Sequence, residues 1–154
     1  MKTHMRLLSP GLFTLALALS ISPAAHAVLG GAASTVQMDH MRMKATVPAA
    51  TGKLNYTVHE MTVPSGTVVR EYIADDKVFA VTWRGPHVPD LKQLMGTYFD
   101  TYRNEAQTHR SGHNHLAIEH PEFVMHASGH MRAYTGSAYL PSMLPAGVTA
   151  NDIQ

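Results

Sequence analysis

The chain contains no cysteine, one tryptophan and no apolar run long enough to cross a membrane. Without cysteine it can form no disulfide, carry no lipid on a cysteine and use no thiol nucleophile. An excess of basic residues is also missing. Lys2 and Arg6 lie in the first 27 residues, so the remaining residues contain 10 of the 12 Lys and Arg together with all 11 Asp and Glu. This near-neutral balance argues against a nucleic-acid-binding protein, which would carry a basic stripe.

The first residues have the three parts of an export signal. Positive residues open the chain, an apolar run occupies residues 12–21, and small residues stand at 25–27. The apolar run is about half of the roughly 20 residues that a membrane-spanning helix needs. We therefore expect residues 1–27 to be a cleaved signal peptide and residues 28–154 to form a single domain, soluble in the periplasm or the medium.

Hydrophobic periodicity predicts a short helix and then three strands. Ser34 stands where a helix cap is useful, and the mixed apolar and charged residues behind it favour a helix over residues 34–47. Period-two alternation predicts strands at residues 54–59, 67–73 and 78–83. The connections contain Pro, Gly and Asp and are short, so these three strands should form an antiparallel meander.

The clearest helical pattern lies in the middle of the chain. Asp90 followed by Gln93 fits a capping box, and apolar residues recur at helical spacing from Leu91 to Tyr102. Gly96 in this stretch suggests that another element packs closely against the helix. After a polar loop at residues 108–114, two or three further strands are expected beyond Pro121, with Gly129 and Gly136 at turns or bulges.

These elements predict an α+β domain. Its antiparallel sheet should have about five strands and pack against one long amphipathic helix, with a short N-terminal helix in addition. The common catalytic signatures, such as a nucleophile elbow or a phosphate-binding glycine loop, do not occur. No particular serine is indicated as a nucleophile, so an enzyme is the less favoured class, although a Ser/His/Asp triad assembled only in three dimensions stays open.

Histidine is the most enriched residue type. Of the 11 histidines, six fall within residues 109–130. The spacing of His109, His113, His115 and His120 could surround zinc, copper or nickel, since imidazole is a good ligand for all three. The alternative interpretation is a solvated histidine-rich loop. By default we therefore expect no cofactor.

Arginine and aromatic residues on the predicted strands suggest a second candidate surface. Arg70, Tyr72, Trp83 and Arg132 are of the types that dominate the energetically important positions of protein interfaces. They could form a partner-binding face on the sheet, or they could be half-buried strand residues.

Several short motifs together resemble the domain-of-unknown-function 2844 family of exported bacterial proteins. They are YTVHE at 56–60, PSGTVVREY at 64–72, VFAVTW at 78–83, SGHMRA at 128–133 and LPAGV at 144–148. The resemblance implies a secreted single-domain protein without an assigned activity, and it supplies no catalytic residues. We expect a non-catalytic exported domain that binds a partner protein or an envelope component. The alternative is a periplasmic metal-binding protein that uses the histidines of residues 109–130.

Overall fold

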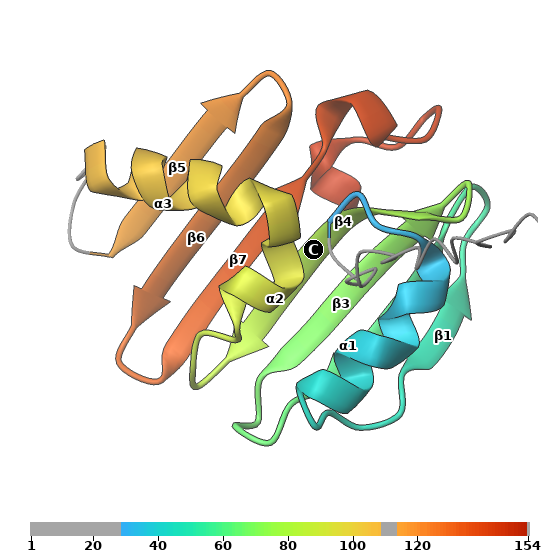
Figure 1. Ribbon diagram of the computed structural model, residues 1–154, viewed down its shortest axis with the longest axis horizontal. Helices are drawn as coiled ribbons and strands as arrows, with labels where there is room; N and C mark the ends of the chain where they lie inside the picture. The colour runs from blue at the N-terminus through green and yellow to red at the C-terminus, as the bar shows by residue number, and fades with distance from the viewer. Residues whose placement is uncertain (1–28, 109–113, 154) are drawn as a thin grey trace, which may run out of the picture.

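The computed structural model describes residues 29–108 and 114–153 (Figure 1). Within them, seven strands form one antiparallel sheet in the order β1-β2-β3-β4-β7-β6-β5. The strands are β1 (Ala49–Gly52), β2 (Thr57–Thr62), β3 (Val68–Ala74), β4 (Lys77–Gly85), β5 (His115–His120), β6 (Phe123–His130) and β7 (Ala133–Tyr139). The α-helices are α1 (Val36–Arg42), α2 (Leu91–Met95) and α3 (Phe99–Thr108). Short 3₁₀ turns lie at Ala33–Thr35, Gly96–Tyr98, Pro141–Met143 and Ala150–Asp152.

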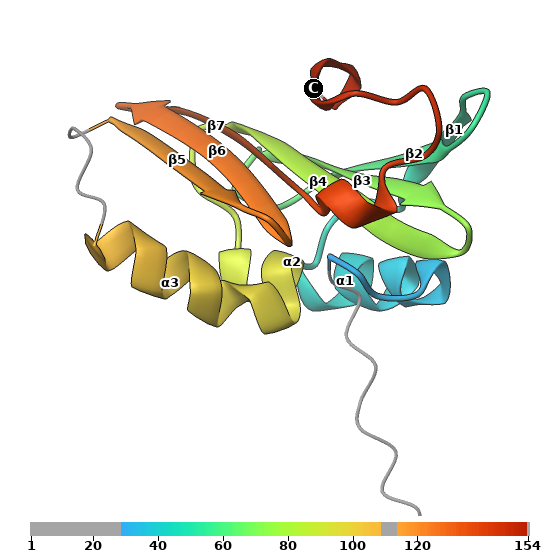
Figure 2. The ribbon, with the colours of Figure 1, turned by 90° about the horizontal axis from the view of Figure 1, so that it is seen from above.

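The molecule has two layers. All three α-helices lie on one face of the sheet, which we call the helix face (Figure 2). Leu140 still packs in the helix-face core, and the C-terminal segment, residues 144–153, lies on the opposite side. That opposite side is called the open face. None of the helices in the described part of the chain is long and apolar enough to span a bilayer.

The main core lies between the sheet and the helices. Side chains alternate between the two faces of a strand, so every second residue of β3, β4 and β7 points at the helices. Val69, Trp83 and Ala138 come from these strands, while Leu94 and Met95 of α2 cover them, and all five are buried. A second, smaller cluster lies on the other side of the sheet, under the C-terminal segment, around Tyr72, Phe79, Ala80 and Ile153.

The prediction of a sheet of about five strands was wrong. The two additional strands are the edges of the sheet, β1 and β5. All four residues of β1 are exposed, so no apolar pattern marks this strand, and its pairing with β2 defines it. Strand β5 lies in the histidine-rich stretch whose composition indicated a loop, yet Leu116 and Ile118 alternate there with polar residues.

The prediction of one long helix was also wrong. Gly96 has φ +51°, outside the helical region, so the stretch after Asp90 divides into α2, a 3₁₀ turn and α3. This backbone conformation is the physical role of Gly96. One half of the expected capping box is present, because the Asp90 carboxylate accepts a hydrogen bond from the Gln93 backbone N–H at 3.0 Å. The Gln93 side chain donates to Asp39 and does not complete the box. The short helix α1 begins at Val36 and ends at Arg42, well inside the residues expected to be helical.

Two glycines expected at turns or bulges lie instead within paired strands. Gly136 of β7 is opposite Trp83 of β4, and a Cβ atom built on Gly136 would lie 2.2 Å from the indole ring. Gly129 of β6 has the ring of Tyr134 at a similarly short distance, 2.4 Å. Both glycines are therefore required by aromatic rings packed directly on the backbone.

Two carboxyl groups are buried where α1 packs on the sheet. Asp39 of α1 is 0% exposed and Glu71 of β3 is 1% exposed. Burial is the largest cause that raises the pKa of Asp39, to about 6, and burial also raises the pKa of Glu71 well above its ordinary value. The Gln93 side chain donates a hydrogen bond to Asp39. The neighbouring Asp39 raises the pKa of Glu71 further, because two adjacent buried charges repel.

Candidate functional site

The open face carries two parallel rows of polar side chains. Strand register places Glu60, Arg70, Thr82, Ser137 and His126 side by side across β2, β3, β4, β7 and β6. A neighbouring row contains Arg84, Thr135, Ser128 and His115 from β4, β7, β6 and β5. Residues two apart on a strand share a face, so both rows point away from the helices.

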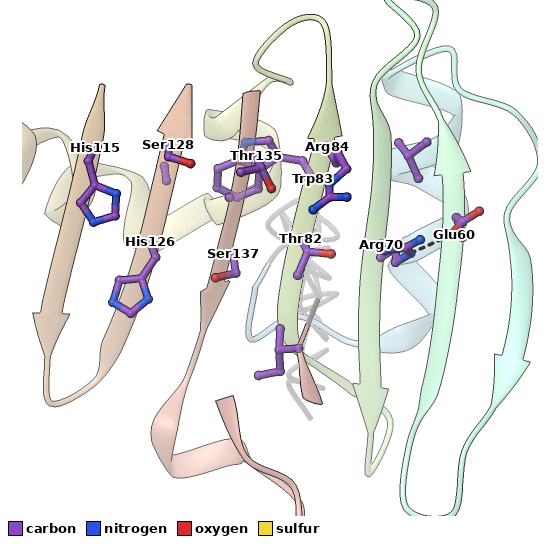
Figure 3. Close-up of a pocket in the computed structure, with 14 residues that line it drawn as sticks. Glu60, Arg70, Thr82, Trp83, Arg84, His115, His126, Ser128, Thr135 and Ser137 are labelled. Atoms are coloured by element: carbon purple, nitrogen blue, oxygen red, sulfur yellow. Dashed lines mark hydrogen bonds and ion pairs between the residues drawn. The ribbon is translucent and has the colours of Figure 1, made fainter. Parts of the chain in front are cut away.

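These two rows line a groove of about 510 Å³ (Figure 3). Figure 3 shows the hydroxyls of Thr82, Ser137 and Thr135 on the central strands, with the arginines on one side and the histidines on the other. Ile153 of the C-terminal segment also lines the groove, and its side chain is buried against the sheet. The groove therefore begins beside the C-terminal segment and occupies the part of the open face that this segment leaves exposed.

The charges in the groove are unevenly compensated. The Arg70 Nε and Glu60 Oε2 atoms form an ion pair at 2.7 Å. Arg84 is exposed, and no carboxylate of the described residues lies within ion-pair distance of it. Within the same described residues, the hydroxyls of Thr82, Thr135 and Ser137 make no hydrogen bond to protein groups. The groove thus offers an uncompensated guanidinium beside hydroxyls that can each donate and accept.

Glu119, His126 and Ser137 have the residue types of a catalytic triad and lie on adjacent strands. Ser137 is directly opposite His126, and the His126 Nε2 atom lies 3.8 Å from a Glu119 carboxylate oxygen. That separation exceeds a hydrogen bond, and no hydrogen bond between Ser137 and His126 occurs among the described residues. Both members of the Glu119–His126 pair are also solvent-exposed. The geometry suits binding better than activation of a serine.

The four residues of the predicted partner surface do not share one face. Arg70 lies in the groove, whereas Tyr72, two residues further along β3, is 3% exposed beneath the C-terminal segment. Trp83 is 2% exposed and its ring packs on Gly136. Arg132 is in the β6–β7 turn with φ +63°. Only Arg70 has its charged group on the open face within the groove.

The predicted metal ligands are partly outside the described residues. His109 and His113 lie there, while His115 and His120 stand at the two ends of β5. An odd and an even position on one strand point to opposite faces, so the sheet separates His115 from His120. Among residues 29–108 and 114–153, no three His, Asp or Glu side chains are placed to hold a metal ion.

Sequence reasoning missed the hydroxyl residues of the groove. Thr82, Thr135, Ser128 and Ser137 occupy strand positions that alternate with apolar residues, which is also how any solvent-facing side of a strand reads. Their alternation was a signal for one polar face. Their proximity depends on the pairing of β4 with β7, which no local pattern reveals.

A second hollow, of about 660 Å³, lies on the helix face between α3 and strands β5 to β7. Its walls are largely core side chains, among them Leu91, Tyr102, Leu116 and Met125. These side chains supply apolar contact and no charge, so the groove on the open face holds the more specific chemistry.

Comparison with known proteins gives a family and no activity. No curated protein and no solved structure matches the chain. A family model described as "Protein of unknown function (DUF2844)" matches residues 25–153. That match takes in every helix and strand described above, and the chain therefore belongs to the DUF2844 family.

Proposed function

We propose that this protein is a non-catalytic binding domain and that the groove on the open face holds part of an envelope component or a partner protein. The observation that supports this most is the register of two polar rows across six strands, on a part of the sheet that none of the described α-helices covers. An uncovered antiparallel sheet face needs polar residues for solubility. Solubility alone does not require a hollow lined by an uncompensated arginine and unengaged hydroxyls.

A blocking substitution tests this proposal. Ser137 lies at the centre of the groove, between Thr82 and His126. Ser137→Trp would place an indole in the hollow, and Asn104→Trp on exposed helix α3 is the matched control. The ¹⁵N-labelled protein is titrated with separated carbohydrate and protein fractions of the cell envelope, and the shifted backbone amides are mapped.

We expect one fraction to shift amides of β3, β4, β7 and β6, with the effect lost in Ser137→Trp and kept in Asn104→Trp. Shifts confined to the helix face would contradict the proposal. An unchanged response of the Ser137→Trp protein would contradict it equally.

Metal binding by the histidine-rich segment is the competing proposal. Calorimetric titration with zinc, copper and nickel separates the two. Micromolar or tighter binding that is lost in His113→Ala and His115→Ala would favour the metal proposal. His115 also lines the groove, so His113→Ala is the variant that separates the two proposals. Loss of metal binding in His113→Ala with an intact envelope footprint would show two separate activities.

Export is part of the same proposal. A binding domain for envelope components has to leave the cytoplasm, and the residues before Val28 have the composition of an export signal. N-terminal sequencing of the protein recovered from the periplasm or medium should start at Val28. A chain found there with Lys2 and Arg6 still attached would contradict cleavage.

A further inference from the structure

The groove has a direction and a length that restrict its ligand. Arg70 lies on β3 and His115 on β5, four strand intervals apart in the order β3-β4-β7-β6-β5. At about 4.8 Å per interval, the groove crosses the strands for roughly 19 Å. A single small anion would fill only a fraction of this length. The shape suits an extended chain that lies across the strands.

The side chains favour hydroxyl-rich ligands over peptides. The floor carries the hydroxyls of Thr82, Thr135 and Ser137, which match ligand groups that also donate and accept hydrogen bonds. Val68, Ala127 and Ile153 add apolar surface to the groove. Peptide recognition by a sheet ordinarily uses an edge strand or pockets for apolar side chains. Central strands β4 and β7 are fully paired on both sides, so their backbone groups are not available to a peptide.

The charge in the groove adds a requirement for an acidic group. Arg70 is paired with Glu60 at 2.7 Å, which leaves Arg84 as the uncompensated cation beside the hydroxyl floor. A guanidinium forms two parallel hydrogen bonds to one carboxylate, and this geometry distinguishes arginine from lysine. The remaining charged or titratable groups along the groove are His115, His126 and, beside His126, Glu119.

Resting on the proposed function, we infer that the ligand is an acidic polysaccharide, with Arg84 holding a sugar carboxylate and the hydroxyls of Thr82, Thr135 and Ser137 holding neighbouring sugar hydroxyls. A neutral polysaccharide would leave Arg84 unused. An acidic peptide would bind Arg84 but has fewer hydroxyl groups to match those of Thr82, Thr135 and Ser137.

Three probes of similar length test the inference by calorimetry and amide mapping: oligogalacturonate, neutral malto-oligosaccharide and poly-glutamate. We expect oligogalacturonate to bind on the open face, to weaken with added salt, and to bind more tightly than the other two. Arg84→Gln should weaken it roughly tenfold or more, because a charge-assisted bidentate contact is lost. The affinity of Arg84→Lys for oligogalacturonate should lie between those of the unaltered protein and Arg84→Gln, since lysine keeps the charge without the planar guanidinium.

Arg103→Gln is the matched control, because Arg103 is an exposed arginine on α3 whose removal changes the net charge equally. Its affinity should stay within about twofold of the unaltered protein, as expected for a distant exposed charge. The amide spectrum of each variant verifies that it is folded.

Each other outcome overturns the inference in a recognisable way. Equal binding of malto-oligosaccharide on the open face would remove the acidic requirement while leaving the proposed groove in place. Equal or tighter binding of poly-glutamate would remove the polysaccharide class. Absence of binding by all three probes would overturn the inference alone, because the Ser137→Trp experiment with envelope fractions judges the groove separately.

Discussion

Replacing Asp39 by asparagine should stabilise the protein at neutral and alkaline pH. Burial raises the pKa of Asp39 from 3.8 to about 6, so the folded state binds this proton more tightly than the unfolded state does. Stability from Asp39 is therefore complete below pH 4 and is lost as the pH rises through about 6. Each pKa unit corresponds to 1.36 kcal/mol, which makes the loss on the order of 3 kcal/mol between pH 4 and pH 8.

Asparagine keeps the contacts of the buried pair. Its carbonyl oxygen can accept the hydrogen bond that Gln93 donates to Asp39, and its amide can donate to Glu71. The raised pKa of Glu71 acts in the same direction as that of Asp39, because Glu71 also loses a proton as the pH rises. Removing the Asp39 charge also relieves part of the effect on Glu71. The stabilisation by Asp39→Asn should therefore be at least as large as the value worked out for Asp39 alone.

Urea unfolding from pH 4 to pH 8 measures the effect, with fluorescence of the single, buried tryptophan Trp83 as the signal. The pKa of His59 is lowered by burial, but His59 is present in both proteins and cancels in the difference. The attraction between Arg42 and the ionised Asp39 is lost in Asp39→Asn, and it is already included in the raised pKa of Asp39. Asp100→Asn, on the exposed surface of α3, is the control and should change stability by less than about 0.5 kcal/mol.

The expected result is a pair of curves that nearly meet at pH 4 and diverge by about 3 kcal/mol at pH 8, with Asp39→Asn the more stable. Parallel curves across this range would refute the argument, because they would show that Asp39 binds its proton equally in both states. A variant less stable at pH 8 would refute it as well, since it would mean that the ionised carboxylate is favoured in the fold.

Three other substitutions test the packing. Gly136→Ala should destabilise by about 1–3 kcal/mol in urea and shift the emission of Trp83, since the new Cβ would lie 2.2 Å from the indole; an unshifted spectrum would contradict this. Phe123→Ala should cost about 3–5 kcal/mol in the same assay because Phe123 is 0% exposed, and a cost below 1 kcal/mol would contradict its place in the core. Thr67→Val should cost about 1–3 kcal/mol and speed amide exchange in the β4–α2 loop, because the Thr67 hydroxyl donates to the His87 carbonyl at 2.7 Å; unchanged exchange would contradict that role.

The sequence predicted the elements whose side chains alternate clearly. Strands β3 and β4 were found close to their bounds because period-two patterns and short turns are local signals. The strand predicted at residues 54–59 was displaced, since β2 runs from Thr57 to Thr62 and Leu54 is exposed. Strand β1 has no buried residue, so only its hydrogen bonds to β2 define it. The division of the central helix depends on the positive φ of Gly96, and glycine is compatible with either conformation.

The candidate site was predicted less completely than the fold. Arg70 was identified because arginine is frequent at interfaces, but Trp83 is of an equally frequent type and is buried against Gly136. Residue type alone cannot decide between these outcomes. The face that a residue occupies decides it, and this depends on how distant strands pair, as Thr82 does with Ser137.

The separation of the two faces makes stability and binding independently testable. Buried apolar contact on the helix face supplies most of the hydrophobic stabilisation, whereas the groove side chains of β4 and β7 are hydroxyls that bury little apolar area. Ser137→Ala removes one unengaged hydroxyl and should leave unfolding in urea unchanged within about 0.5 kcal/mol. If the same substitution weakens ligand binding, the hydroxyl acts on the ligand; if it lowers stability instead, the groove is part of the structural core and the binding proposal loses its basis.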